Sequence, residues 1–234
     1  MPQYPRIIPA SDSALLIEFG DTIDYDINDR VYSLQREIEV SEFSEAVEEF
    51  IPSYRSLLVE YDPAEYGYQE IHDRVAMLVE SGGVAASRIA DTGEDAHQIP
   101  VAYGGDYGPD LNTVADHAGL TPEEVIEIHS GTDYHVFMLG FAPGFPYLGG
   151  LDERIACPRL ATPRTLVPAG SVGIAEAQTG VYPNASPGGW QLIGQTPMAL
   201  FDVEADPPAA MLPGTKVNFV PITHDEYESR LGSG

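Results

Sequence analysis

The distribution of glycine and proline constrains the fold of this chain more than any other feature. The segment from Gly140 to Pro197 holds 10 of the 23 glycines and 8 of the 20 prolines. Proline fixes φ and glycine adopts angles that other residues avoid, so loops rich in both are rigid and closely shaped. From Tyr134 onward, short apolar runs are separated by glycine or proline every eight to twelve positions. This spacing predicts an all-β barrel or sandwich.

The first ninety residues instead follow the pattern of a compact α+β sandwich. Apolar runs at 14–20 and 46–62 predict strands, the second being two extended pieces that meet near Pro52. Two amphipathic helices alternate with these strands, with apolar residues spaced by three and four. These residues are Ile27, Val31, Leu34 and Ile38, and then Ile71, Val75, Leu78 and Val79. With a last strand and a polar linker within 83–97, the order of elements matches the split βαβ plan.

A strand and two short helices open the second half of the chain. The run "HQIPVAYGG" predicts a strand that ends at two glycines. Asp110 can cap the first helix, which stops at Gly119, and Thr121 with Glu124 forms a capping box for the second. The tail "HDEYESRLGSG" is expected to be solvated.

The net charge of −26 limits the kinds of molecule that this chain can bind. With 37 acidic residues and Lys216 as its single lysine, the chain repels phosphate backbones, which argues against nucleic-acid binding. Such an acidic, halophile-type surface is typical of a protein kept soluble in a high-salt cytoplasm, where counter-ions screen self-repulsion. No apolar run approaches the length of a membrane span, and the N-terminus lacks a signal-peptide pattern. We therefore expect a cytoplasmic protein without membrane contact.

The single cysteine excludes two kinds of stabilisation. Cys157 has no second cysteine with which to form an internal disulfide, and it cannot supply a cysteine-based zinc site. No other pattern predicts a metal site. Because no histidine lies near it in sequence, Cys157 is expected to be a small buried hydrophobic residue.

A long neutral segment marks where a site should lie. Between Tyr134 and Phe201 the only acidic residues are Asp152, Glu153 and Glu176, and they are matched in number by three arginines. Elsewhere in this chain, ordinary exposed positions have become acidic. A neutral segment of this length is therefore either buried or kept neutral for a functional reason.

The polar and aromatic side chains of this segment form a candidate binding site. Arg159 and Arg164 each follow a proline and offer planar forks for carboxylate or phosphate oxygens. Trp190 is either a binding platform or a core residue. Groups that could bind an amide or a carboxylate are Gln178, Thr179, Tyr182, Asn184 and Ser186. A rigid wall facing a ligand cleft or a partner subunit is expected from Phe141, Phe145 and Tyr147.

Standard catalytic signatures are absent from the sequence. It contains no G-x-S-x-G, H-E-x-x-H, phosphate-binding loop or dinucleotide fingerprint. His129 and His135 could act as acid or base, and His129 draws attention because it ends a helix just before the neutral segment. The residues alone thus indicate a small-molecule or peptide binding module, with any catalysis in a partner complex.

Several long blocks of the sequence resemble one family. They are "IPVAYGGDYGPDL", "LTPEEVIEIHSGTDYHVFMLGFAPGFPYLGGLD", "CPRLATPRTLVPAGSVGIAEAQTGVYPNASPGGWQLIGQTP" and "PGTKVNFVPI". They are similar to the carboxyltransferase-type family called allophanate hydrolase subunit 1, which includes the B subunit of the ATP-dependent 5-oxoprolinase and a sporulation-kinase inhibitor. The resemblance implies an α+β ferredoxin-like domain over residues 1–90 and a mainly β cyclophilin-like barrel over residues 96–225.

The resemblance is strongest to the 5-oxoprolinase member of this family and implies a function in a complex. It implies a hydrolase subunit, inactive alone, that acts with subunits A and C to open 5-oxoproline to L-glutamate at the expense of ATP. ATP, with Mg²⁺, would bind largely elsewhere in the complex, and the substrate would be a small cyclic amide with a carboxylate. Carried over by position, the resemblance makes His129 the acid or base. The substrate-binding residues that it implies are Arg159, Arg164, Gln178, Tyr182, Ser186, Gly188, Gly189 and Trp190.

Two residues depart from the family pattern, and the resemblance leaves two other functions open. Glu176 stands where the family usually has glycine, and Gln195 stands where it usually has arginine. The first adds a carboxylate near the expected site, and the second removes a cation. A regulatory protein that inhibits a histidine kinase, or a subunit of a urea-pathway enzyme, would also fit the resemblance.

Overall fold

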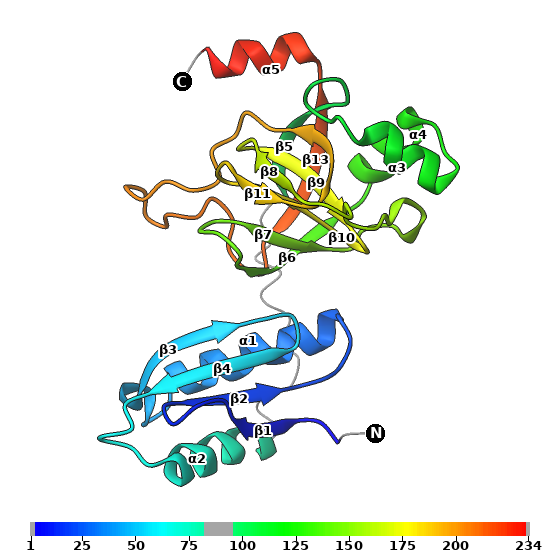
Figure 1. The fold of residues 1–234 in the computed structure, drawn as a ribbon. Helices are drawn as coiled ribbons and strands as arrows, with labels where there is room; N and C mark the ends of the chain where they lie inside the picture. The colour runs from blue at the N-terminus through cyan, green and yellow to red at the C-terminus, as the bar shows by residue number, and fades with distance from the viewer. Residues whose placement is uncertain (1–2, 82–95, 233–234) are drawn as a thin grey trace. The chain divides into compact units, whose positions relative to one another are not determined.

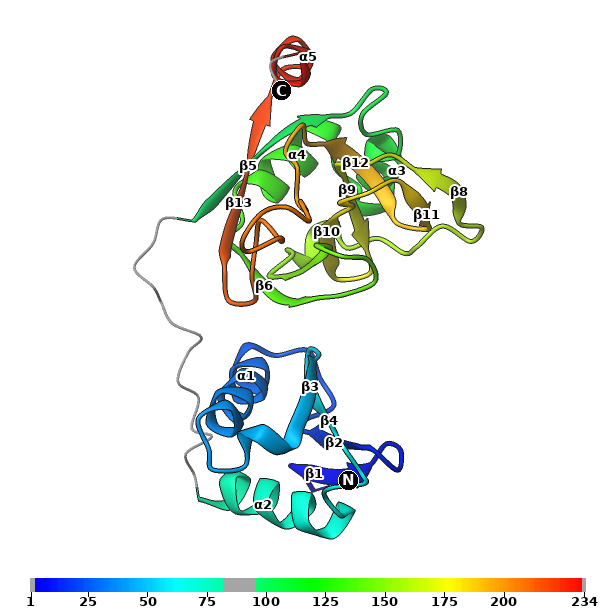
Figure 2. The ribbon, with the colours of Figure 1, turned by 90° about the vertical axis from the view of Figure 1, so that its left-hand side faces the viewer.

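A computed structural model describes residues 3–81 and 96–232 of the chain. The chain divides into two compact units, Met1–Gly93 and Glu94–Gly234 (Figures 1 and 2). None of the helices in the described ranges combines the length and the apolar character that crossing a bilayer requires.

The N-terminal unit is built on an antiparallel sheet with the strand order β1-β2-β4-β3. The strands are β1 (Arg6–Pro9), β2 (Ala14–Glu18), β3 (Val47–Pro52) and β4 (Ser56–Tyr61). The helices are α1 (Tyr25–Glu39), the short η1 (Ser44–Ala46) and α2 (Tyr68–Glu80). Helix α1 contacts β3, β4 and α2, and α2 contacts β1. On β4, Leu57, Val59 and Tyr61 are fully buried and alternate with half-buried residues, because one face of the sheet lies against the helices.

The elements of this unit agree with the predicted strands and helices except at the two ends. The predicted helical residues Val31, Leu34 and Ile38 are fully buried along one side of α1. Strand β1, which pairs with β2, is not predicted by the sequence pattern. The last strand predicted within 83–97 lies almost wholly outside the described residues.

The C-terminal unit is a closed barrel with the strand order β10-β7-β6-β13-β5-β12-β9. Its strands are β5 (His97–Tyr103), β6 (Tyr134–Leu139), β7 (Pro146–Gly149), β9 (Ser171–Ala175), β10 (Gln178–Val181), β12 (Gln191–Gln195) and β13 (Lys216–Ile222). Strands β5 and β13 are parallel, and the other neighbours are antiparallel. The prediction of a β barrel or sandwich is thus confirmed as a barrel. Cys157 is buried among its core residues, as expected, and burial raises the pKa of its thiol.

Helices flank the barrel, as Figure 1 shows. They are α3 (Leu111–Ala118), α4 (Pro122–Ser130), the short η2 (Glu153–Ile155) and α5 (His224–Leu231). The predicted capping box of α4 is present, since Thr121 N–H donates to Glu124 Oε2 at 2.7 Å and Glu124 N–H donates to Thr121 Oγ1 at 3.2 Å. The described part of the tail is exposed as expected except at Tyr227, which is buried, but it also forms the unpredicted helix α5.

A two-stranded ribbon accompanies the barrel and contributes Gly188 to the candidate site. It pairs β8 (Arg164–Val167) with β11 (Ser186–Gly188). A separate apolar cluster includes residues of the ribbon and of the barrel. Its buried members are Phe145, Val167, Ala175, Tyr182, Trp190 and Leu192.

Candidate functional site

Most of the residues expected at a binding site line one pocket of the barrel unit. The pocket has a volume of about 160 Å³. Its lining residues are Phe141, Phe145, Tyr147, Arg159, Leu160, Pro163, Tyr182, Gly188, Gly189 and Trp190. The neutral, Gly- and Pro-rich segment therefore supplies the entire wall of this pocket, which places the predicted aromatic wall at a cleft.

Aromatic rings form the rigid part of the pocket. Phe145 is buried and meets Tyr182 and Trp190 edge to face, with ring centroids 5.3 and 5.5 Å apart. Phe141 is 62% exposed, and its φ of 67° lies in the left-handed region that few residues other than glycine adopt. Phe141 also meets the Phe145 ring edge to face at 5.4 Å. This backbone conformation is unfavourable in free energy for a phenylalanine, and it places an exposed ring at the pocket.

Gly188 lets the ribbon approach the Tyr182 ring, whereas its neighbour Gly189 has more room. A Cβ on Gly188 would lie 2.5 Å from the Tyr182 hydroxyl oxygen and 2.9 Å from its ring carbons. A Cβ on Gly189 would lie at an ordinary 3.5 Å from Pro163. The shape of the pocket therefore depends on the missing side chain at Gly188, but much less on that at Gly189.

Arg159 supplies the positive charge of the pocket. Its side chain is exposed, and its Cζ lies 6.0 Å from the centre of the Trp190 ring, within cation–π range. Within residues 3–81 and 96–232, no carboxylate forms an ion pair with Arg159. Burial raises the pKa of the Tyr147 and Tyr182 hydroxyls, so both stay protonated at neutral pH. Arg159 opposes this rise at Tyr147, and at Tyr182 a hydrogen bond with the Trp190 backbone opposes it more than Arg159 does. The pocket thus joins one unpaired guanidinium to flat apolar walls, which suits a small ring with a carboxylate.

Arg164 is placed differently from Arg159. Its Nη2 lies 2.6 Å from Oδ1 of Asp110, and its Nη1 donates to the Trp190 carbonyl at 3.4 Å. The other carboxylate oxygen of Asp110 accepts from the Leu192 N–H at 2.6 Å. Asp110 occupies the N-cap position of α3, but it bonds to these groups and makes no side-chain cap. Arg164 is not a lining residue, and it supports the Trp190 backbone as part of a partly buried ion pair.

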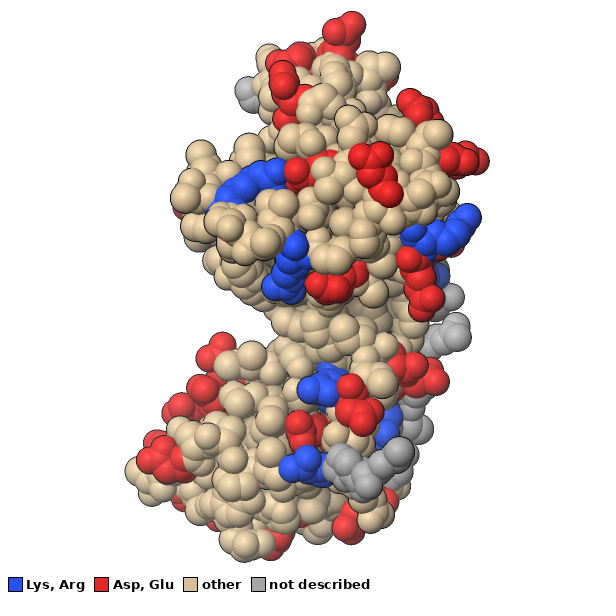
Figure 3. Space-filling model, turned by 45° about the vertical axis from the view of Figure 1, so that its right-hand side comes forward, with Lys and Arg blue, Asp and Glu red and all other residues tan. Residues whose placement is uncertain are grey.

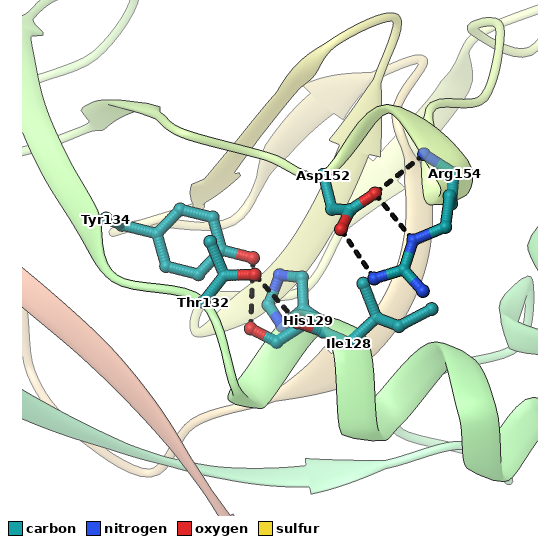
Figure 4. Close-up of polar contacts among 6 residues, drawn as sticks. All are labelled: Ile128, His129, Thr132, Tyr134, Asp152 and Arg154. Atoms are coloured by element: carbon teal, nitrogen blue, oxygen red, sulfur yellow. Dashed lines mark hydrogen bonds and ion pairs between the residues drawn. The ribbon is translucent and has the colours of Figure 1, made fainter.

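His129 lies in the core of the barrel unit. It is fully buried between the Tyr103 hydroxyl, 2.8 Å from Nδ1, and Thr179 Oγ1, 3.0 Å from Nε2. Its backbone carbonyl accepts from the Tyr134 hydroxyl at 2.9 Å (Figure 4). Burial lowers the pKa of its imidazole to about 3, so the ring is neutral at physiological pH. The structure does not bring His129 to the pocket, and we assign it no part in the site.

A neutral, buried His129 gives the unfolding free energy a defined pH dependence. Between the pKa of about 3 in the folded protein and about 6.5 in the unfolded chain, only the unfolded chain takes up a proton on this imidazole. Acidification within that range should therefore remove stability, by up to about 1.4 kcal/mol per pH unit. His129→Gln should lack this contribution. Urea unfolding followed by Trp190 fluorescence checks this, and parallel pH profiles of the two proteins would contradict it.

Four further residues that the sequence singled out do not line the pocket. Gln178 begins β10, and Ser186 begins β11. Gln195 donates from Nε2 to the Ala169 carbonyl at 2.6 Å. Glu176 is exposed, lies in the turn between β9 and β10 and has a φ of 53°, a conformation for which glycine is the usual choice. This explains the glycine of the family pattern, and Glu176 puts no carboxylate into the pocket wall.

Sequence reasoning missed three residues that shape the site. Leu160 and Pro163 line the pocket next to the predicted arginines, within a segment whose density of proline was the available signal. The sequence indicates Asp110 only as a helix cap, and nothing local in it indicates the contact with Arg164, which is 54 residues away.

Among the residues that line the pocket, Arg159 alone is charged. On the face drawn in Figure 3, this unit shows broad areas without charge, interrupted by single acidic and basic side chains. Arg154, the third arginine of the neutral segment, pairs with Asp152 at 2.6 Å (Figure 4). Among the described residues, no group of three or more His, Cys, Asp or Glu side chains could hold a metal ion.

Comparison with known proteins places this fold and pocket in a family. The model of the carboxyltransferase domain, subdomain C and D, matches residues 5–211. The chain therefore belongs to the carboxyltransferase domain C and D family. Within it, the chain is similar to the B subunit of 5-oxoprolinase from Bacillus subtilis, with 46% identity over 231 residues, 96% of this chain and 95% of the relative. It is also similar to the B subunit of 5-oxoprolinase from Escherichia coli O157:H7, with 60% identity over 124 residues, 53% of this chain and 57% of the relative.

The chain is also similar to proteins of known structure. A conserved uncharacterized protein from Pyrococcus horikoshii is 50% identical, with a TM-score of 0.56 over 95% of this chain and 100% of that one. The urea carboxylase of Kluyveromyces lactis has a TM-score of 0.77 over 95% of this chain and 22% of that one. At 22% identity, this second likeness concerns the fold alone.

Proposed function

We propose that this chain is the B subunit of an ATP-dependent 5-oxoprolinase and acts with subunits A and C to open 5-oxoproline to L-glutamate. The observation that carries the proposal is the 46% identity to a protein of that name over nearly the full length of both chains. Relatives of the same name in two further species are 57–60% identical over about half of the chain. We also propose that residues 1–90 form a ferredoxin-like domain, that residues 96–225 form a cyclophilin-like barrel, and that the complex is cytoplasmic.

The chemistry of the pocket supports this substrate. 5-Oxoproline is a small flat lactam that carries one carboxylate. The unpaired guanidinium of Arg159 offers a charge-assisted partner for the carboxylate, and the rings of Trp190 and the exposed Phe141 offer apolar contact for the lactam. Protonated hydroxyls of Tyr147 and Tyr182 can donate to the lactam carbonyl as charge develops on its oxygen.

We assign the binding of ATP to the partner subunits. A lactam is a poor electrophile, and transfer of a phosphoryl group from ATP to its oxygen activates the carbonyl carbon for attack by water. The C–N bond then breaks with release of the amine, which leaves an acyl phosphate, and a second water molecule hydrolyses this acyl phosphate to the new carboxylate and inorganic phosphate. Because this chain has no phosphate-binding loop, we assign ATP and Mg²⁺ to subunits A and C and substrate binding to the pocket.

Reconstitution of the three subunits tests the proposal. The complex should hydrolyse ATP only when 5-oxoproline is present, and this subunit alone should be inactive. Arg159→Ala should raise the KM for 5-oxoproline by roughly 10- to 100-fold, because it removes a hydrogen bond to a charged group. Arg154→Ala is the matched control, since Arg154 is an exposed arginine already paired with Asp152 outside the pocket.

Two results would overturn the assignment. A verified complex without 5-oxoproline-dependent ATP turnover would reject the enzymatic function and favour a regulatory binding protein. An equal effect of the two arginine variants on KM would reject the pocket as the substrate site.

A further inference from the structure

Two hydrogen bonds hold the backbone on either side of Arg159. The Pro158 carbonyl accepts from Nε2 of Gln191 at 2.9 Å. The Leu160 N–H donates to the Gly189 carbonyl at 2.7 Å. The chain on both sides of the arginine is therefore fastened to the short stretch that also contains the tryptophan beneath its guanidinium.

Gln191 makes one of these bonds from a buried position. It is 5% exposed, and its Oε1 accepts no hydrogen bond from the described part of the chain. The opposite orientation of the amide would set Oε1 against the Pro158 carbonyl, so the bond from Nε2 fixes the orientation. A buried acceptor without a partner carries a free-energy penalty that an apolar side chain of similar size would avoid. Holding Pro158 in place accounts for an amide at this position.

We propose that Gln191 is a positioning residue that keeps Arg159 over the Trp190 ring, where the guanidinium meets the carboxylate of the substrate. Without the amide, Pro158 loses its partner, and the guanidinium is no longer held at one place in the pocket. Gln191 itself is not a lining residue, so it acts through Arg159. The identity of the substrate rests on the proposed function, whereas the positioning of Arg159 does not.

Steady-state kinetics of the reconstituted complex test the proposal. Gln191→Leu should raise the KM for 5-oxoproline roughly five- to tenfold and leave kcat within about twofold, because binding and not chemistry is affected. Gln195→Leu is the matched control, since Gln195 also lies on β12 and donates to a backbone carbonyl, that of Ala169, away from the pocket. Both variants should unfold in a cooperative transition.

A double-mutant cycle and a pH profile separate positioning from general loss of structure. In the Arg159→Ala background, Gln191→Leu should cause no further rise in KM. Gln191→Glu can donate to Pro158 only when its carboxyl group is protonated, so its KM should fall as the pH is lowered, whereas that of Gln191→Leu should not. Additive effects of Arg159→Ala and Gln191→Leu, or a pH-independent KM for Gln191→Glu, would overturn the proposal.

A measurement on the isolated subunit keeps this inference separate from the proposed function. Trp190 is the single tryptophan, and a guanidinium held over its ring affects its emission. Gln191→Leu and Arg159→Ala should change the Trp190 spectrum in the same direction, and Gln195→Leu should leave it unchanged. The wild-type complex could lack turnover while Gln191→Leu and Arg159→Ala still shift the Trp190 spectrum in the same direction. That result would reject only the proposed function. If Gln191→Leu keeps the wild-type spectrum and KM, only the positioning role fails.

Discussion

Replacing Asp110 by alanine should lower the free energy of unfolding of the barrel unit by about 3 kcal/mol. The substitution removes the partner of Arg164 and the acceptor of the Leu192 N–H at once. Leu192 is buried, so its amide would lie in the interior without a partner. Because these bonds join the start of α3 to β8 and β12, their loss weakens three elements together. Urea unfolding followed by Trp190 fluorescence measures the effect.

Two variants calibrate the Asp110 result. Asp110→Asn keeps an acceptor for the Leu192 N–H and loses only the ion pair, so it should cost about half as much. Asp116→Ala removes an exposed carboxylate from α3 and should change the free energy of unfolding by less than about 0.5 kcal/mol. Equal effects of Asp110→Ala and Asp116→Ala would show that the partly buried pair contributes nothing specific.

Gly188→Ala should lower kcat/KM for 5-oxoproline by about 100-fold in the reconstituted complex. The new methyl group would lie 2.5 Å from the Tyr182 hydroxyl oxygen. Tyr182 cannot retreat, because Phe145 and Trp190 pack against its ring. The ribbon or the ring must therefore shift, and either movement changes the wall to which the substrate binds.

Gly189→Ala serves as the control for this variant. It adds the same methyl group one residue further on, where Pro163 lies at ordinary contact distance. Its kcat/KM should stay within about threefold of the wild-type value. Gly188→Ala with wild-type kinetics would show that the substrate does not bind in this pocket.

Local patterns predicted most of the fold. Apolar spacing of three and four located α1 and α2, and the sequence from Thr121 to Glu124 located the start of α4. The same capping pattern recurs at Thr223 and Glu226, where both reciprocal hydrogen bonds form, and this overlooked signal indicates α5. Strand β1 was not predicted from the sequence. Its four residues include a proline, and buried and exposed positions do not alternate clearly along it.

The sequence predicted which segment forms the site, but not which side chains contact one another there. The neutral segment with its glycines and prolines indicated the correct wall, since rigid loops must lie at defined places on a scaffold. Arg159 and Arg164 look alike in sequence, each following a proline. Their different roles depend on Asp110, which only the folded chain brings to one of them. His129 likewise cannot be told from a catalytic histidine until its burial is known.

The parallel pairing of β5 with β13 has a consequence for how the protein is made. These strands are the first and last of the barrel, and contacts such as that between Gln98 and Asn218 join residues 120 positions apart. During synthesis, every intervening strand leaves the ribosome before the strand that seals the barrel is available. Closure is therefore a late and slow event, since long-range pairing must first overcome the entropy of a large loop. Until then the unfinished sheet has unpaired edges, and the dense negative charge of the chain helps to keep nascent copies from associating.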